Sequence, residues 1–383
     1  MTAQYASNGN APIYLDWNAT TPVHPAVQQQ MLDAQTQLFG NPSSVHWFGR
    51  AAREGIESAR ASLAKAFAAH QRDVLFVSGG TEANNLALLD AKGLITSELE
   101  HPSVTRVAHE LERRGKPVRW LPAMPTGLID VDALAQAVEG MPSNSVVAVQ
   151  AVNHETGVIQ PLAVVADLAH RAGCYLHVDA VQAFGKLETE QFLHGDSFAI
   201  AAHKIRGPKG IGALIWRCGR SAPQPLLFGG SQQRGLRPGT PDPVSVIGFA
   251  RAVELAASQV AARADIGKLR DRLELELGDV TRPNIEGAAR LSHVASLYVP
   301  GWAGDELVAA LDVEGLCVSS GSACSAGTAE PSPVIAAMHG ADRARGTLRF
   351  SLGELTTDAE VTRACEITRR VVMRGLGRVG NRV

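Results

Sequence analysis

The sequence of 383 residues lacks the features that mark several large classes of protein. Its five cysteines are odd in number and include no CxxC pair, which argues against a disulfide framework or a zinc ribbon and favours a reducing compartment. No apolar run approaches the ~20 residues of a membrane span, and the N-terminus has no basic start followed by an apolar stretch. We therefore expect a cytoplasmic protein without a membrane partner.

An excess of charge of either sign is also absent. The 36 basic and 38 acidic residues leave a formal net charge of -2, which gives no electrostatic case for binding nucleic acid. The sequence contains neither the GxxxxGK of a P-loop nor the HExxH of a zinc protease. A small-molecule or protein partner is the better expectation, and no metal site is predicted.

The length suits two domains, and the 45% apolar content is enough to bury a sizeable interior. Strand-like and helix-like stretches alternate between residues 74 and 217, which predicts an α/β fold with a largely parallel sheet covered by helices. After residue 260 the strand-like and helix-like stretches follow one another in a different pattern. We predict a large domain over 15–260 and a smaller α/β domain that combines 1–14 with 261–383.

Helices are predicted where apolar residues recur at helical spacing and where the end signals agree. The clearest of them cover residues 25–39, 45–69, 162–171, 304–313 and 358–374. A further helical stretch over 244–277 is interrupted near Gly267 and leads out of the large domain.

Residues 177–212 carry the strongest sign of chemistry. Asp179 ends one predicted strand and Lys204 follows the end of the next, so both lie at the edge of a parallel sheet where ligands bind. A lysine there can form a Schiff base with an aldehyde cofactor, and an acid can keep a pyridinium nitrogen protonated. The alternative is a lysine that reaches into water and an aspartate that caps the next helix.

Further candidates lie where other strands end. Residues 78–82 join a strand to a helix, a geometry that directs backbone N–H groups at an anion such as phosphate, with an ordinary N-cap turn as the alternative. His101 precedes a proline, where a histidine is more often a cap or loop residue than a catalyst. The glycine-rich basic loop over 229–240 either binds phosphate or turns a corner.

Residues 319–328 are all small and cannot pack a core. We therefore predict a mobile, exposed loop with Cys324 near its centre. An accessible cysteine suggests a nucleophile, and a chance loop cysteine is the alternative.

Four sequence stretches, HVDAVQ, HKIRGPKGIG, RPGT and SSGSAC, follow one another in this order. With them, nearly the whole chain resembles the cysteine desulfurases of the NifS/IscS group, within the class V aminotransferase family. The resemblance implies the aspartate aminotransferase-like fold of the fold-type I pyridoxal phosphate enzymes. It also implies a homodimer that acts on L-cysteine.

The resemblance gives a role to each candidate residue around the cofactor ring. Lys204 would carry pyridoxal 5'-phosphate as a Schiff base, Asp179 would pair with the pyridine nitrogen, and Gln182 would reach the phenolic oxygen. His101 would stack on the ring and move protons. Arg349 would bind the substrate carboxylate through its planar guanidinium.

The phosphate of the cofactor would be held from both subunits. The residues that the resemblance assigns to it are Gly80, Thr81 and His203, with Thr240 arriving from the other subunit of the homodimer.

The implied reaction takes sulfur from L-cysteine and leaves L-alanine. The Cys324 thiolate would attack the substrate sulfur and keep it as a persulfide. The persulfide would pass to an acceptor protein for iron-sulfur cluster assembly or tRNA thiolation, and Cys324 could transiently ligate a cluster shared with a scaffold partner. The short basic end of the chain, residues 375–383, identifies no acceptor.

At two positions the chain departs from the family pattern. His154 stands where relatives usually have asparagine near the cofactor phenol and the substrate carboxylate, and an imidazole is bulkier and can titrate. Ala201 stands where they usually have serine, and the lost hydrogen bond to phosphate is worth roughly 0.5–1.5 kcal/mol. We expect these changes to affect cofactor affinity and rate more than the class of reaction.

Two other functions stay open from the sequence. A related class V aminotransferase or lyase, such as a selenocysteine lyase, would share the fold, although a plain transaminase has no use for Cys324. A non-catalytic paralogue that binds a scaffold protein is favoured by His154 and Ala201. That last function predicts no cofactor absorbance and no release of sulfide.

Overall fold

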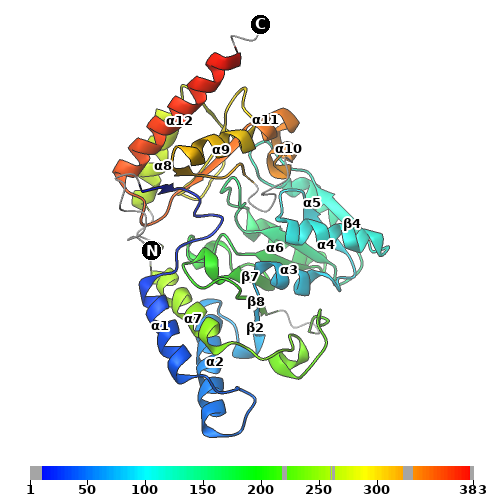
Figure 1. Cartoon of the computed structure of the whole chain (residues 1–383). Coiled ribbons are helices and arrows are strands. Elements are labelled where there is room, and N and C mark those ends of the chain that lie inside the picture. Colours follow the sequence, from blue (N-terminus) through cyan, green and yellow to red (C-terminus); the bar gives the residue numbers. More distant parts are fainter. Residues whose placement is uncertain (1–10, 218–221, 259, 261–263, 322–330, 380–383) are drawn as a thin grey trace.

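The computed structural model describes residues 11–217, 222–258, 260, 264–321 and 331–379 (Figure 1). Its larger sheet has seven strands in the order β2-β8-β7-β6-β5-β3-β4. Their bounds are β2 (Val74–Val77), β3 (Leu94–Ser97), β4 (Val118–Leu121), β5 (Val146–Gln150), β6 (Tyr175–Asp179), β7 (Ser197–Ala201) and β8 (Gly212–Trp216).

Five of these strands, β7, β6, β5, β3 and β4, run parallel, and only β8 is antiparallel to its neighbours β2 and β7. The prediction of a largely parallel sheet is therefore confirmed. The carboxyl ends of the parallel strands meet at one edge, because helices carry the chain back between them.

Helices cover both faces of this sheet, and the strand residues alternate between them. Val147 and Val149 of β5 pack into the core under α2, α5, α6 and α7, whereas Val146 and Ala148 pack toward α3 and α4. A strand buried on both faces reads as a continuous apolar run, as β5 does. The helices are α2 (Trp47–Ala66), α3 (Gly80–Leu88), α4 (Pro102–Arg113), α5 (Val131–Ala137), α6 (Leu162–Arg171) and α7 (Pro243–Ser258).

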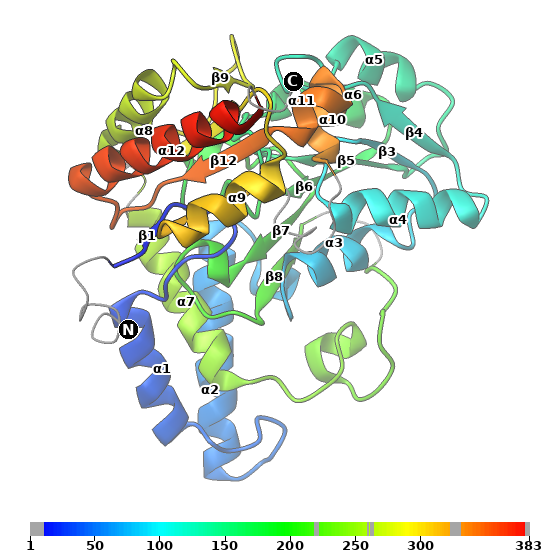
Figure 2. The ribbon, with the colours of Figure 1, turned by 45° about the horizontal axis from the view of Figure 1, so that its top comes forward.

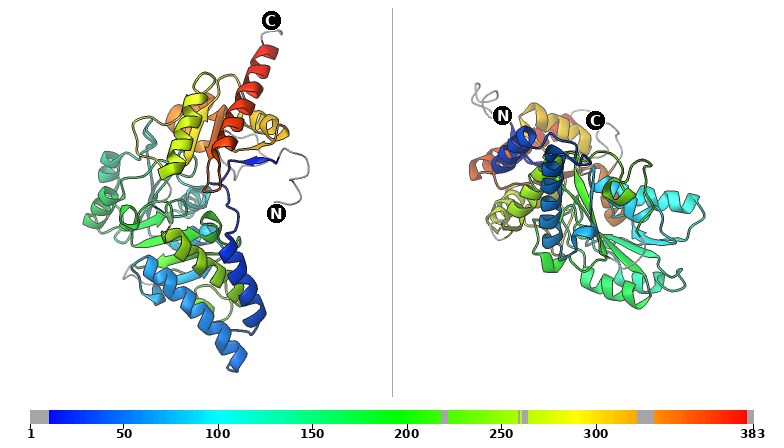
Figure 3. Two further views of the ribbon diagram at one scale, coloured as in Figure 1. Left: turned by 90° about the vertical axis from the view of Figure 1, so that its left-hand side faces the viewer. Right: turned by 90° about the horizontal axis from the view of Figure 1, so that it is seen from below.

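At one end of the molecule α1 (Pro25–Gln37) and α2 pack against α7 (Figures 1 and 3). α7 ends at Ser258 and α8 (Ala264–Glu276) follows, so this stretch is interrupted as predicted, but the interruption lies before Gly267. Gly267 lies inside α8, where an added Cβ would meet the Ser292 side chain at 3.3 Å. Its small size serves close packing rather than a helix break.

The opposite end holds a three-stranded antiparallel sheet with α8, α9 and α12 beside it (Figure 2). Its order is β12-β10-β9, and a separate parallel pair joins β1 to β11. The elements are β1 (Ile13–Tyr14), β9 (Arg282–Pro283), β10 (Val294–Tyr298), β11 (Leu316–Cys317), β12 (Thr347–Ser351), α9 (Gly304–Val313), α10 (Pro333–His339), α11 (Ala341–Arg345) and α12 (Asp358–Val379).

The N-terminal strand β1 belongs to this second core, in which Ile13 and Leu15 are buried. Val334 and Ile335 of α10 instead pack into the core of the large sheet. The domain boundaries at residues 14 and 260 remain a prediction. α10 lies in the predicted small domain by sequence but packs against the core of the large sheet. Within the described ranges, no helix is both long and apolar enough to cross a membrane.

The predicted exposed loop over 319–328 is wrong in its first part. Ser319 and Gly321 are buried, and the Ser319 backbone exchanges two hydrogen bonds with Arg349 of β12, at 3.2 and 2.7 Å. Small residues here fit beside a neighbouring strand instead of facing water. Residues 322–330, with Cys324 and its predicted exposure and mobility, lie outside the described ranges.

Candidate functional site

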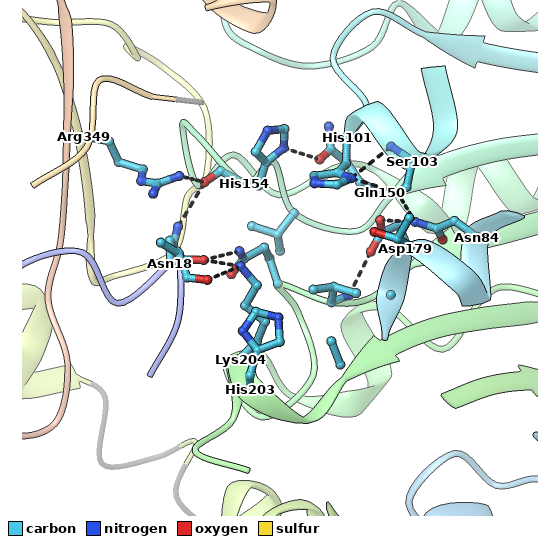
Figure 4. A pocket seen from close by; sticks show the side chains of 17 residues that line it. Asn18, Asn84, His101, Ser103, Gln150, His154, Asp179, His203, Lys204 and Arg349 are labelled. Atoms are coloured by element: carbon cyan, nitrogen blue, oxygen red, sulfur yellow. Dashed lines mark hydrogen bonds between the residues drawn. The ribbon is translucent and has the colours of Figure 1, made fainter. Parts of the chain in front are cut away.

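A cavity of about 380 Å³ opens at the carboxyl ends of β5, β6 and β7 (Figure 4). This volume is within the range of small-molecule sites, about 300–1,000 Å³. Most residues that the sequence singled out line it. They are Gly80, Thr81, His101, His154, Asp179, Gln182, His203, Lys204 and Arg349.

Asp179, the last residue of β6, is held on both of its carboxylate oxygens. Oδ1 accepts from the backbone N–H of Val181 at 3.0 Å, and Oδ2 accepts from the Asn84 amide at 2.7 Å. The Asn84 carbonyl lies 2.9 Å from Nε2 of the buried His177. Asp179 is therefore held in a fixed orientation at the cavity, and it also makes the local turn contact that the alternative explanation predicted.

His101 also serves as a cap and as a wall of the cavity. Its Nδ1 accepts from the backbone N–H of Ser103 at 3.1 Å at the start of α4, and the Ser103 hydroxyl lies 2.8 Å away. Burial, opposed by the charge of Asp179 and aided by that of Lys204, lowers the pKa of His101. A neutral imidazole in this position can accept a proton.

Lys204 does not reach into water. It ends a short 3₁₀ turn after β7, and its Nζ donates to the carbonyl oxygens of Asn18 at 2.5 Å and Ala19 at 2.8 Å. The Asn18 carbonyl also accepts from Gln182 Nε2 at 3.0 Å. The amide oxygen of Gln182 in turn accepts from Nζ of the buried Lys186. The amine at position 204 thus faces the cavity in a fixed orientation (Figure 4).

The N-terminus of α3 forms the end of the cavity nearest β8. A Cβ added to Gly80 would lie 2.7 Å from Val181 Cγ2, so a larger residue would displace this wall. His203 lies here with Nδ1 3.2 Å from the Thr20 hydroxyl. Burial and the nearby lysine charges lower the pKa of His203 to about 4, so this ring is neutral at pH 7. Backbone N–H groups at a helix start suit a phosphate.

Arg349 enters the cavity from β12, and its side chain is 2% exposed. Its Nη2 pairs with Asp16 Oδ1 at 2.7 Å, and its Nη1 donates to the carbonyls of His154 and Gly321, both at 3.0 Å. Nε has no partner among the described residues. Because a guanidinium has five N–H groups, donors remain for a ligand carboxylate.

His154 lies between His101 and Arg349. Its ring packs edge-on against the His101 ring with 5.3 Å between centroids, and Nδ1 is 3.5 Å from the Gln150 amide oxygen. Burial, followed by the charges of His101, Arg349 and Lys204, holds the pKa of His154 well below its usual value. The imidazole is neutral at pH 7.

Two of the predicted site residues are not in this cavity. Thr240 lines a separate cavity of about 210 Å³ with Arg237 and Gly239, so its contact with a cofactor in the other subunit stays a prediction. Cys324 lies outside the described residues. In the part of the chain that the structure describes, no group of three or more His, Cys, Asp and Glu could hold a metal ion.

The residues that hold the predicted ones in place are not marked by any motif in the sequence. Asn84 and Lys186 are buried polar side chains that contact Asp179 and Gln182, and Asp16 pairs with Arg349. For the two buried polar residues the available signal was a polar side chain inside an otherwise apolar helix or turn. For Asp16 no local signal existed, because its partner is 333 positions away.

Comparisons with known proteins agree on one family. The family model described as aminotransferase class-V matches residues 13–364. A cysteine desulfurase IscS of Methylococcus capsulatus is 39% identical, over 95% of this chain and 93% of the relative. The structure of a NifS-like protein is similar with a TM-score of 0.86 and 29% identity, over 94% of this chain and 99% of that one. The structure of SspA in complex with cysteine has a TM-score of 0.76 and 31% identity, over 88% and 98% of the two chains.

Proposed function

This chain belongs to the class V aminotransferase family and within it to the cysteine desulfurases, and on that premise we propose how its own residues carry the reaction. The proposed reaction moves the sulfur of L-cysteine to the thiol of Cys324. One C–S bond breaks and one S–S bond forms, so the products are L-alanine and a persulfide on Cys324. The solved relative in complex with cysteine supports this choice of substrate.

The residues present fit pyridoxal phosphate as the cofactor. The cavity offers an amine at Lys204, a carboxylate at Asp179 and the start of α3 beside Gly80, where no side chain has room. When bound, the cofactor supplies an aldehyde carbon that holds the substrate amine and a ring that accepts electrons from the α-carbon.

The protein's own groups bind the substrate and move protons. Lys204 Nζ would bind the aldehyde carbon of the cofactor and would accept the proton from the α-carbon of the substrate. The Asp179 carboxyl would pair with the ring nitrogen, and the neutral His101 would exchange protons in the cavity. The remaining N–H groups of Arg349 bind the substrate carboxylate.

A single observation carries this proposal. Lys204, Asp179 and the start of α3 come from three separate stretches of sequence, and all three line the same cavity at the sheet edge. A degenerate paralogue would have no reason to keep an amine, a carboxylate and a helix start around one cavity.

The proposal includes a homodimer. Large apolar side chains are exposed around the start of α2, where Phe39 is 69% and Trp47 63% exposed, and the rings of Phe39 and Phe48 lie 4.8 Å apart. Exposed aromatic clusters of this kind mark protein interfaces. A second subunit covering this end is expected to bring Thr240 to the partner's cofactor.

An acceptor protein completes the cycle by taking the persulfide sulfur. We propose that this sulfur serves iron-sulfur cluster assembly or tRNA thiolation, because the relative from Methylococcus capsulatus carries the IscS name.

The test is the reaction of the purified protein with L-cysteine and a reductant. Wild type is expected to release sulfide and alanine in equal amounts, Lys204→Ala to form neither, and Cys324→Ala to lose activity on L-cysteine. Lys65→Ala, on the last turn of α2, is the matched control for loss of a lysine.

Selenocysteine separates the remaining alternatives. Loss of activity on L-cysteine with retained activity on selenocysteine in Cys324→Ala supports the persulfide role. A Cys324→Ala variant that matches wild type on L-cysteine would rule that role out. A wild-type protein that binds no cofactor and releases no sulfide would favour the non-catalytic paralogue.

A further inference from the structure

Glu155 has a fully buried carboxyl group that the proposed reaction does not use. It follows His154 in the segment between β5 and α6. Its Oε2 accepts a hydrogen bond from the Ser332 hydroxyl. The same oxygen would lie 2.7 Å from a Cβ added to Gly321, so the carboxyl packs directly against the backbone there. Glu155 thus contacts one residue on each side of the segment 322–330.

The two contacts of Glu155 have little freedom. Gly321 has φ of +105°, a region that residues with a Cβ rarely adopt, and the carboxyl fills the space of a side chain. Ser332 is the N-cap of α10, so its Oγ accepts from the Ile335 N–H at 3.0 Å while its proton goes to Glu155. Both donor and acceptor capacity of this hydroxyl are in use.

Arg349 joins the same segments a second time. Its Nη1 donates to the carbonyls of His154 and Gly321, one on each side of the junction that Glu155 makes. Its Nη2 is held by Asp16. The group that we assign to the substrate carboxylate is therefore positioned by the junction between the β5–α6 segment and Gly321.

The second carboxyl oxygen of Glu155 lies beside His154, which lines the cavity. Oε1 is buried without a hydrogen-bond partner among the described residues, and it lies 3.6 Å from Nε2 of His154. Burial raises the pKa of Glu155 to about 7, opposed by the Ser332 hydrogen bond and the charge of Arg349. The other charged or titratable groups nearby are His101, which packs on His154, and Asp16, which pairs with Arg349.

We propose that Glu155 is a positioning residue, which ties Gly321 and Ser332 to the cavity wall and so fixes Arg349 and His154 for substrate binding. The consequence for the reaction rests on the proposed function, whereas the tie itself does not. A neutral carboxyl places no charge beside the neutral His154 ring, whereas an ionised one leaves a buried charge there.

The experiment uses the cofactor-loaded protein and two substitutions at the same position. Glu155→Gln keeps an amide oxygen for Ser332 and cannot ionise, whereas Glu155→Ala removes the tie. Thermal unfolding midpoints and the KM and kcat for L-cysteine are measured from pH 5.5 to 8.5. The exposed Glu139→Gln serves as the matched control.

The direction in which the stability should change with pH follows from the pKa of Glu155. Glu155 keeps its proton in the folded protein up to about pH 7 and loses it near 4.5 when unfolded, so its contribution to stability falls as pH rises between these values. The wild-type midpoint is therefore expected to fall by several degrees relative to Glu155→Gln between pH 5.5 and 7.5, and then to level off. Glu139→Gln is expected to follow wild type.

The kinetic data distinguish the effect of the contacts that Glu155 makes with Gly321 and Ser332 from the effect of its charge. Glu155→Gln is expected to keep the KM for L-cysteine within about twofold of the wild-type value at pH 6. Glu155→Ala is expected to raise this KM about tenfold to 100-fold, which is the range for loss of one hydrogen bond between Arg349 and the substrate carboxylate. The kcat should change less, because Lys204 and His101 are not touched. Ser332→Ala is expected to shift KM in the same direction by less, and it replaces Glu155→Ala if that variant does not fold.

Three results would overturn the inference. The first is a wild-type KM in both Glu155→Ala and Ser332→Ala at every pH, and the second is an equal rise of KM in Glu155→Gln and Glu155→Ala at pH 6. The third is a difference in unfolding midpoint between wild type and Glu155→Gln that does not change with pH. If the midpoints behave as expected but no protein releases sulfide, the tie stands and the proposed function fails.

Discussion

In the cavity wall that the large sheet supplies, His101 and Asp179 have contacts within the local chain, whereas Arg349 on the opposite wall is held by contacts between distant segments. His101 is fixed by Ser103 and Asp179 by Val181, each two positions away. Arg349 instead depends on Asp16, 333 positions away. Lys204 is the exception on the first wall, because its Nζ donates to the distant carbonyls of Asn18 and Ala19. Each wall can be tested separately.

The largest effect is expected from Asp179→Asn on the sheet wall. Both carboxylate oxygens accept hydrogen bonds, so an amide there would turn its NH₂ toward another donor and would also remove the charge. We expect kcat for alanine formation to fall by roughly 10²–10⁴-fold, as for loss of a charge-stabilising group in an active site. Asn84→Ala is the control, since it removes one hydrogen bond but keeps the charge. An equal loss in both variants would show that the charge is not what matters.

On the opposite wall Arg349→Lys is expected to act mainly on substrate binding. A lysine ammonium cannot bridge Asp16, two carbonyls and a carboxylate at once, as the planar guanidinium can. The KM for L-cysteine should rise about tenfold to 100-fold, with a smaller change in kcat. Steady-state kinetics check this. A fall in kcat at unchanged KM would contradict the assignment of Arg349 to the substrate carboxylate.

Gly80→Ala tests the crowded start of α3. The new Cβ would lie 2.7 Å from Val181 Cγ2, and overpacking of this size costs about 1–3 kcal/mol. Cofactor affinity, measured by titration of the apoprotein with pyridoxal phosphate, should weaken by roughly tenfold. Val181→Ala in the same chain should restore much of it. Without such rescue, the lost space would not be the cause.

The smallest effect is expected from Ala201→Ser, at the end of β7 beside the same wall. A hydroxyl there can donate to the cofactor phosphate, and one neutral hydrogen bond is worth about 0.5–1.5 kcal/mol. Cofactor affinity should therefore improve by roughly twofold to tenfold. Unchanged or weaker affinity would mean that Ala201 does not face the phosphate.

The two walls also differ in how far the sequence predicted them. Asp179, His101 and Lys204 could be predicted because each follows an apolar strand, and the helix over Leu162–Arg171 has the predicted bounds. Each of these three residues has both a structural and a cavity-facing contact or position. For His101 the two interpretations, a helix cap and a catalyst, are compatible, because its ring has two nitrogens.

What the sequence could not supply are contacts that only the folded chain creates. The Asn18 carbonyl accepts from Lys204 across 186 positions, and no side-chain pattern marks a backbone oxygen. The position of the helix break before α8 cannot be read from Gly267, because a helical glycine that allows close packing gives the same signal as one that ends a helix. Ser319 and Gly321 were predicted as exposed, because small residues suit a tight junction as well as a loop.

The central claim is that the amine of Lys204 binds the cofactor aldehyde. It is tested most directly by loading the protein with pyridoxal phosphate, reducing it with borohydride and locating the modified lysine by peptide mass spectrometry. The account predicts one pyridoxyl group on Lys204 and none on the neighbouring buried Lys186. A label on Lys186 in the wild-type protein, or no label in a protein that releases sulfide from L-cysteine, would contradict it.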